Sequence, residues 1–190
     1  MQGRMEPHLN PVQTANPLAW EPIVASVGDA ARAACQLGAA FSPARRAAFQ
    51  DKLERYARKP KRVLILAVCG SRVLGFVTAI EAQEAPASLS HAAAGYLKDH
   101  AALTGLLVDP RCRRQGIGEG LLRRAEQWCR ERGKAGAWLV THRMADWHRR
   151  HLGYREVGRI LHRRAEKRVM ARHFNDDAGH VGQRAARPSQ

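Results

Sequence analysis

The hydrophobic pattern is most informative between Leu103 and Arg132, where its period changes from that of a strand to that of a helix. The first part is a short apolar run that ends at Asp109-Pro110, with the length and punctuation of a buried strand. The second part has helical spacing and stops at Gly133. Its apolar face consists of Ile117, Leu121, Leu122, Ala125, Trp128 and Cys129. The stretch therefore predicts a strand, a turn and an amphipathic helix in that order.

The rest of the chain carries weaker patterns of the same two kinds. The expected elements are a short strand over 18–24, helices over 29–36 and 43–57, a hairpin over 63–68 and 72–80, a surface loop or short helix over 81–100, a strand over 135–141, and a closing antiparallel pair over 154–161 and 167–174. Asp29 is expected to cap the first helix, and Ser42-Pro43 to start the second. The buried side of the second helix is expected to be Ala47, Phe49, Leu53 and Tyr56.

The turn between the strand and the helix has the composition of a phosphate cradle. It reads Arg113-Arg114-Gln115-Gly116-Ile117-Gly118. A helix N-terminus has unpaired backbone N–H groups and favours negative charge, and glycine lets a ligand approach that backbone closely. Arginines add charge-assisted hydrogen bonds to a phosphate. A solvated loop before a surface helix is the alternative, but strand, turn and helix in this order favour phosphate binding.

Two common phosphate motifs do not fit this turn. A P-loop ends in Gly-Lys-Ser/Thr, which is missing here. The dinucleotide fingerprint needs GxGxxG and a later acidic residue at the end of the next strand, whereas this chain has GIGEG followed by a strand reading AWLVTH.

Length and composition indicate one globular domain. The 190 residues can bury a full core, and 45% of them are hydrophobic. We expect an N-terminal tail over 1–17, a domain over 18–174 and a disordered C-terminal tail over 175–190. The four cysteines contain no CxxC pair, so neither a zinc site nor a disulfide framework is indicated. No apolar run approaches the roughly 18 residues of a membrane span, and no signal pattern begins the chain, so we expect a cytoplasmic protein without membrane contact.

The turn and the strand before it resemble the acetyl-CoA motif of the GCN5-related N-acetyltransferases, the GNAT family. That motif is Arg/Gln-x-x-Gly-x-Gly/Ala after a strand ending Val-x-Pro, and here Val108-Asp109-Pro110 precedes Arg113–Gly118. The resemblance extends from about Val63 to about Phe174. It implies an α/β (α+β) GNAT fold, with a mixed central sheet of about six or seven strands flanked by helices.

The resemblance also implies acetyl-CoA as cosubstrate, with no metal. The pantetheine arm would lie along the strand that ends at Val108, and the Leu106 N–H would polarise the thioester carbonyl. The pyrophosphate would bind the backbone of the turn. The implied cofactor-binding residues are Leu106, Leu107, Val108, Arg113, Arg114, Gln115, Gly116, Ile117, Gly118 and His142.

A second segment matches the family pattern Asn-x-x-Ala-x-x-Phe-Tyr-x-x-Leu-Gly-Phe and departs from it. Over 142–154, Ala145, Leu152, Gly153 and an aromatic at 154 are in register. His142 takes the place of the Asn, and His148-Arg149 takes the place of the Phe-Tyr pair.

The candidate catalytic residues are Glu81, His148 and Arg149. Arg149 occupies the place of the tyrosine that protonates the departing thiolate in many relatives, but a guanidinium is a poor acid and could only stabilise the thiolate electrostatically. His148 or His151 could donate the proton instead, although an exposed basic helix face is the alternative for His151. Glu81 or His100 could take the proton of the acceptor amine, or Glu81 could be an ordinary loop carboxylate.

The predicted activity is direct acetyl transfer to a primary amine of an unidentified small-molecule or peptide acceptor. The net charge of +15 exceeds what one polyanionic cosubstrate requires, which leaves nucleic acid open as a partner. An RNA-directed enzyme acting on aminoacyl-tRNA is therefore one alternative. A CoA-binding module without turnover is another, because Ala102 and Arg149 stand where relatives often carry catalytic groups. Arginine on helix faces could also serve solubility alone, and a homodimer stays open.

Overall fold

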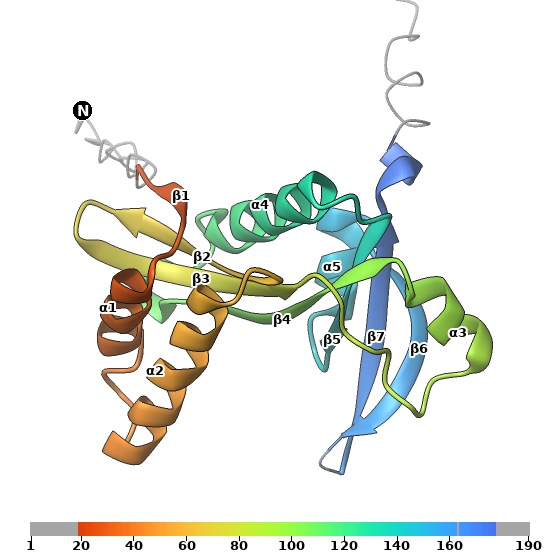
Figure 1. The fold of residues 1–190 in the computed structure, drawn as a ribbon, viewed down its shortest axis with the longest axis horizontal. Helices are drawn as coiled ribbons and strands as arrows, with labels where there is room; N and C mark the ends of the chain where they lie inside the picture. The colour runs from red at the N-terminus through yellow and green to blue at the C-terminus, as the bar shows by residue number, and fades with distance from the viewer. Residues whose placement is uncertain (1–18, 163, 178–190) are drawn as a thin grey trace, which may run out of the picture.

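A computed structural model describes residues 19–162 and 164–177 as a mixed sheet flanked by helices (Figure 1). The seven strands have the order β1-β2-β3-β4-β5-β7-β6. The strands are β1 (Glu21–Val24), β2 (Arg62–Cys69), β3 (Arg72–Ile80), β4 (His100–Val108), β5 (Gly136–Thr141), β6 (Arg155–His162) and β7 (Ala165–His173). The helices are α1 (Val27–Leu37), α2 (Pro43–Arg58), α3 (His91–Leu97), α4 (Ile117–Glu131) and α5 (Ala145–Leu152), with short 3-10 turns at Pro110–Cys112 and Phe174–Asp177. The expected α/β sheet flanked by helices is confirmed.

The central strands bury both faces, which explains their nearly continuous apolar sequence. Along β2, Val63, Ile65 and Ala67 join the core beneath α4, whereas Leu64, Leu66 and Val68 join the core beneath α1 and α2. A third cluster lies between α3 and strands β4, β5 and β7, on the face of these strands that points away from α4. It contains Leu97, Ala102, Trp138, Val169 and Ala171.

Two details of the first helices differ from the expectation. The N-cap of α1 is Ser26, whose hydroxyl accepts a hydrogen bond from the Asp29 N–H, and Asp29 is the third residue of a capping box. Asp29 therefore stabilises this helix start without being the cap. On α2, Leu53 and Tyr56 are buried and Phe49 is half-buried, but Ala47 is exposed. The buried stripe is narrower than the pattern indicated.

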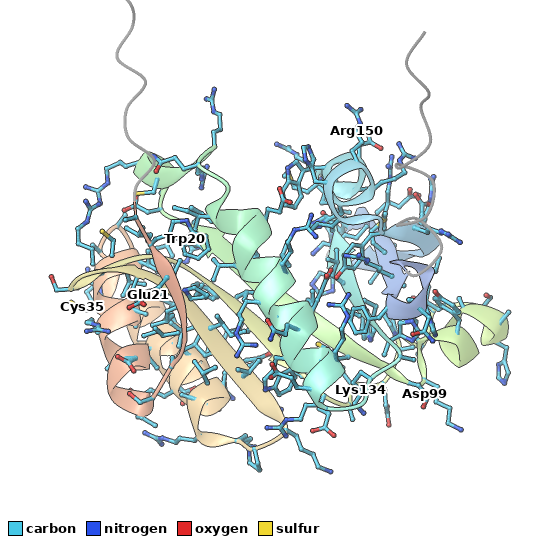
Figure 2. All side chains as sticks on the ribbon, turned by 90° about the horizontal axis from the view of Figure 1, so that it is seen from above. Trp20, Glu21, Cys35, Asp99, Lys134 and Arg150 are labelled. Atoms are coloured by element: carbon cyan, nitrogen blue, oxygen red, sulfur yellow. The ribbon has the colours of Figure 1, made fainter. Side chains whose placement is uncertain are left out.

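The amphipathic helix α4 lies across the sheet with all six expected apolar residues buried. Trp20, labelled in Figure 2, packs so closely on this helix that a Cβ at Gly120 would lie 2.6 Å from the indole ring. Only glycine accommodates that approach. The sequence pattern missed one buried residue, Glu126, whose carboxylate lies 2.9 Å from the Arg172 guanidinium of β7. Burial raises the pKa of Glu126, and Arg172 opposes that shift.

The Glu126–Arg172 pair leads to a prediction about stability. Glu126→Ala would leave the Arg172 cation, whose side chain is 11% exposed, without this partner. Removing one partner of a buried pair costs about 3–5 kcal/mol, so the free energy of unfolding should fall by about that amount in urea titrations. Asp51→Ala, which removes an exposed carboxylate facing Arg55 on α2, is the matched control and should cost at most about 1 kcal/mol. Equal losses for the two variants would contradict this role for Glu126.

The sheet opens between β4 and β5. The two strands pair in parallel only where His100–Leu103 faces Gly136–Leu139. Beyond these residues β5 stays with β7 and β4 stays with β3, so that the two halves of the sheet diverge (Figure 1). The second half of β4 therefore has one edge without a partner strand.

Candidate active site

The open edge of β4 presents backbone groups toward the gap. The Asp109 N–H donates to the Leu74 carbonyl of β3 at 2.8 Å. Since backbone groups of successive residues point to opposite edges of a strand, those of Leu106 and Val108 point away from β3. The Val108 carbonyl accordingly accepts a hydrogen bond from the Arg113 side chain at 3.3 Å. The Leu106 N–H is thus directed into the gap, and this is the group that the resemblance to the GNAT motif implies as a donor for the thioester carbonyl.

The turn after β4 leads into helix α4, whose first residues have no side-chain cap. Gly116, the N-cap residue of α4, has φ +75° and offers no side chain to the helix start. The Gly120 N–H is the first to bond within the helix, to the Gly116 carbonyl at 2.9 Å. The N–H groups of residues 117–119 are therefore available to a ligand. Arg114 also has a positive φ, +61°, which bends the chain tightly before the helix.

A cavity of about 730 Å³ lies in front of this helix start. It brings together eight of the ten implied cofactor-binding residues: Leu106, Leu107, Val108, Arg113, Arg114, Gly116, Ile117 and Gly118. Its other side is formed by α5, through Trp147, His148 and His151. Free amides, two arginines and an apolar floor suit a ligand with a diphosphate at one end and a neutral arm, as in acetyl-CoA.

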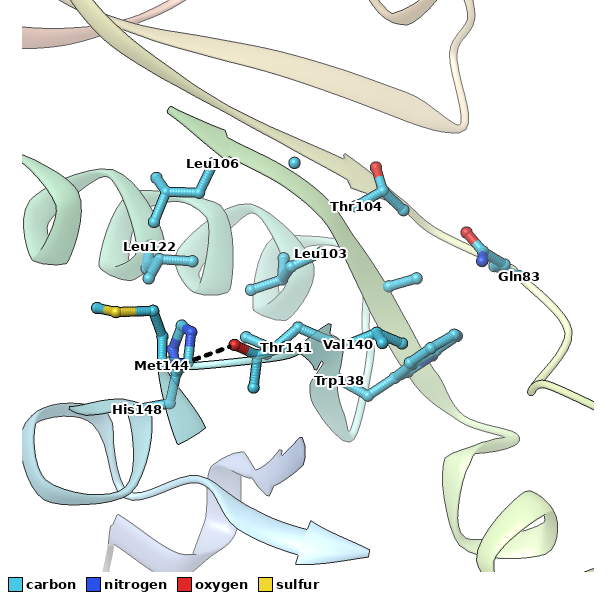
Figure 3. Close-up of a pocket in the computed structure, with 13 residues that line it drawn as sticks. Gln83, Leu103, Thr104, Leu106, Leu122, Trp138, Val140, Thr141, Met144 and His148 are labelled. Atoms are coloured by element: carbon cyan, nitrogen blue, oxygen red, sulfur yellow. Dashed lines mark hydrogen bonds between the residues drawn. The ribbon is translucent and has the colours of Figure 1, made fainter. Parts of the chain in front are cut away.

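A second cavity, of about 390 Å³, occupies the gap between β4 and β5 (Figure 3). It is continuous in lining with the first, because Leu106, Met144 and His148 belong to both. Figure 3 shows His148 of α5 and Met144, the residue before this helix, on the wall that faces Leu106 and Leu122. Among the residues that the structure describes, His148 is the one titratable group shared by the two cavities.

The imidazole of His148 is buried in an apolar setting. Its side chain contacts the rings of Trp147 and Tyr154, and within the described residues its Nδ1 has no hydrogen-bond partner. Burial lowers the pKa of His148 to about 4, because the charged form loses its hydration. The ring is therefore neutral at pH 7, a form that can accept a proton at one nitrogen and donate one from the other.

The buried His148 should make folding sensitive to pH. The pKa of this imidazole is about 4 in the folded chain against an ordinary 6.5, so the unfolded state binds more protons between these values. The contribution of His148 to stability is then complete above pH 6.5 and is lost as the pH falls toward 4, by up to roughly 3 kcal/mol. Burial also lowers the pKa of His100, which acts in the same direction. Urea unfolding at several pH values should show this slope, and His148→Gln should reduce it. The exposed His91 of α3 gives the control His91→Gln, which should keep the slope.

The other two candidate catalytic residues lie outside both cavities. Arg149 points to solvent, with its side chain 64% exposed and paired to Asp146 at 2.6 Å. Glu81 follows the end of β3 and faces Arg132 and Lys134 at 3.5 and 3.8 Å. Both cations follow the C-terminal end of α4, where Figure 2 labels Lys134. The turn at Gly116 is at the other end of this helix, about 20 Å away at 1.5 Å per residue. The structure therefore brings neither Arg149 nor Glu81 to the cavities.

Three further candidates are also placed away from the gap. The His142 Nδ1 lies 3.0 Å from the Glu166 carbonyl oxygen of β7, and Gln115 is exposed within the turn. Neither residue lines either of the two cavities described above. His100, at the start of β4, is buried against Tyr96 and His173, far from the open part of the strand. His151, in contrast, lines the larger cavity and stacks on Trp147.

A chain of hydroxyl groups supports the wall of the smaller cavity and was not expected from the sequence. The pairing of β3 with β4 skips Thr104, which forms a bulge. Its Oγ1 lies 2.6 Å from the Tyr56 hydroxyl of α2 and 3.1 Å from Thr78 Oγ1 of β3. These contacts fix the bulge where the two halves of the sheet separate. A bulge leaves no signature in the apolar pattern, so nothing in the sequence marked Thr104.

Within residues 19–162 and 164–177, no helix combines the length and hydropathy of a membrane crossing. The same part of the chain holds no group of three or more His, Cys, Asp or Glu side chains arranged to bind a metal ion.

Several solved structures share this fold. An aminoglycoside 6'-acetyltransferase type Ii is 18% identical with a TM-score of 0.60, and the match covers 80% of this chain and 96% of that chain. NAA60 of Arabidopsis thaliana, in complex with acetyl-CoA, is 15% identical with a TM-score of 0.59, covering 83% and 99%. The ribosomal-protein-S18-alanine N-acetyltransferase of Escherichia coli is 18% identical with a TM-score of 0.58, covering 80% and 92%. At these identities the likeness is one of fold.

No curated protein matches the chain in sequence. A family model does match it, over residues 32–154, which is more than half of the chain, and its description is "Acetyltransferase (GNAT) family". The matched range includes the open strand β4, the uncapped start of α4 and all of helix α5 with His148. The chain therefore belongs to the GNAT acetyltransferases, as the motif between Val108 and Gly118 had indicated.

Proposed function

We propose that this protein transfers the acetyl group of acetyl-CoA directly to a primary amine. The observation that carries the proposal is the meeting of two cavities at Leu106, Met144 and His148. The larger cavity, at the start of α4, has the features of a diphosphate site, and the smaller cavity, between β4 and β5, has none of them. Two ligands bound in them would touch at this junction, and holding two reactants in contact is a large part of what catalysis requires.

In this proposal the larger cavity holds acetyl-CoA, which supplies the acetyl group as a thioester. The amides of residues 117–119 and the arginines Arg113 and Arg114 bind the diphosphate. The backbone of Leu106 and Val108 pairs with the pantetheine arm along the open edge of β4. Apolar side chains of β4 and α5 cover the arm and exclude water.

Two groups at the junction assist the transfer. The Leu106 N–H donates to the carbonyl oxygen, where negative charge develops as the amine attacks. His148 accepts the proton that the amine loses and passes it to the departing sulfur, so that a C–N bond replaces a C–S bond and the thiol leaves neutral. A histidine that is neutral at pH 7 can perform both steps. Arg149 and Glu81 have no part in this scheme, because neither lines a cavity.

A thiol-release assay tests the activity. Purified protein, acetyl-CoA and one amine at a time should release CoA thiol, and the acetylated amine should appear by mass spectrometry in equal amount. The panel comprises alkylamines, arylalkylamines, polyamines, an aminoglycoside, short peptides and aminoacyl-tRNA. Acetyl-CoA that binds the protein but is consumed with none of these amines would leave a binding module in place of an enzyme.

A further inference from the structure

The smaller cavity carries no charged side chain. Its lining is Gln83, Ala102, Leu103, Thr104, Gly105, Leu106, Leu122, Trp138, Leu139, Val140, Thr141, Met144 and His148. His148 is the one titratable residue in this set, and its imidazole is neutral at pH 7. An acceptor bound here meets apolar surface over most of its length. A second ammonium group on the acceptor would be taken out of water without a counter-charge, which is costly.

Three carboxylates lie one or two residues in sequence from this lining, those of Glu81, Glu84 and Asp146, and none of them lines the cavity. Glu84 is exposed, and the other two are paired with cations. Glu81 faces Arg132 and Lys134, and Asp146 pairs with Arg149. The chain as a whole carries a net charge of +15, which repels polycations before they reach the site. The uncharged lining and the positive net charge of the chain therefore both disfavour an acceptor with several positive charges.

The cavity also offers few side-chain hydrogen bonds. Thr104 Oγ1 already contacts the hydroxyls of Tyr56 and Thr78, and Thr141 Oγ1 accepts the Met144 N–H at 3.2 Å. Gln83, which is exposed at the mouth, is the lining amide side chain without a hydrogen bond in the described part of the chain. Two buried lining groups, Trp138 Nε1 and His148 Nδ1, also have no partner there, so the unpaired side-chain groups are few. A peptide would bury several main-chain donors and acceptors against apolar side chains, and each unpaired group costs free energy.

We propose that the acceptor is a small monoamine, with one primary amine on an apolar carbon skeleton and no second positive charge. This inference rests on the proposed acetyl transfer and names the substrate class of the same site. The apolar lining serves catalysis as well as binding, because desolvation favours the uncharged amine, which is the nucleophile.

Hexylamine and 1,6-diaminohexane form the matched pair that tests the inference, because they differ by one terminal ammonium group. The value of kcat/KM should be at least about tenfold higher for hexylamine. Gln83→Glu places a carboxylate at the mouth and should reduce this preference at least about threefold. Ala82→Glu adds the same charge one residue away, outside the lining, and should leave the preference unchanged. The preference should be measured at 50 and 300 mM salt, because salt screens the long-range repulsion by the net charge more than it screens interactions inside the cavity.

Each outcome decides the inference. A diamine, spermidine or an aminoglycoside used as well as hexylamine would overturn it while leaving acetyl transfer intact. A tetrapeptide used better than any small amine would also overturn it, in favour of a protein acceptor. If no amine is acetylated although acetyl-CoA binds, the proposed function fails, and this inference fails with it.

Discussion

Gly118→Glu is expected to raise the Kd for acetyl-CoA at least about a hundredfold. Gly118 is the second residue of α4 and lies in the wall of the larger cavity, beside the free amides of the helix start. A glutamate there places a carboxylate where the diphosphate is proposed to bind, so that like charges repel and the side chain fills the cradle. A hundredfold loss corresponds to about 2.7 kcal/mol. Isothermal titration with acetyl-CoA measures it directly.

Two further variants at this position separate charge from size. A Cβ at Gly118 would lie 3.7 Å from Val108 Cγ2 and 4.0 Å from Leu106 Cδ2, which is ordinary contact, so Gly118→Ala should bind within about threefold of the wild type. Gly118→Gln has nearly the size of glutamate without its charge, so its Kd for acetyl-CoA should lie between those of Gly118→Ala and Gly118→Glu. All three should keep the thermal midpoint of the wild type, since φ here is not positive. Unchanged affinity of Gly118→Glu for acetyl-CoA would contradict the proposal that this turn binds the diphosphate.

His148→Gln is expected to lower kcat about a hundredfold while the Kd for acetyl-CoA changes less than about threefold. General acid–base groups typically contribute factors of 10² to 10⁴. Glutamine keeps a polar group of similar reach but cannot carry a proton from the amine to the sulfur. The split between kcat and affinity matters, because a role in binding alone would raise the Kd and leave kcat unchanged.

Arg149→Gln is the matched control on the same helix. The two residues are adjacent in sequence, yet His148 lines both cavities and Arg149 faces solvent. The control should keep kcat within about twofold. A loss with Arg149→Gln comparable to that with His148→Gln would return the arginine to the mechanism, in the place that the family motif gives to a tyrosine.

The parts of the fold that follow from local pattern were predictable. The strand, the turn and α4 are specified by residues close in sequence, because their apolar period and glycine positions are local signals. Ser26 shows the limit of such signals. Both Ser26 and Asp29 are good capping residues, and the boundary between them depends on how the chain leaves β1.

The catalytic side of the site depended on tertiary structure. From the sequence, Glu81, His148 and Arg149 all remained candidates, with Arg149 already a poor acid. The tertiary structure, in which β4 diverges from β5, places His148 beside both cavities and the other two outside them. Glu126 illustrates the same limit within the core. A charged residue on an amphipathic helix predicts a solvated position, and its burial becomes intelligible only once Arg172 is seen beside it.

The unpaired edge of β4 has a bearing on how freely this sequence can vary. Under the proposed function the strand grips its ligand with main-chain atoms, which every residue type except proline possesses. Substitutions along such a strand leave these main-chain contacts intact, provided that the backbone conformation is kept. The matched structures share only 15% or 18% of their residues with this chain and still have its fold, which is the degree of sequence change that binding through main-chain atoms would tolerate.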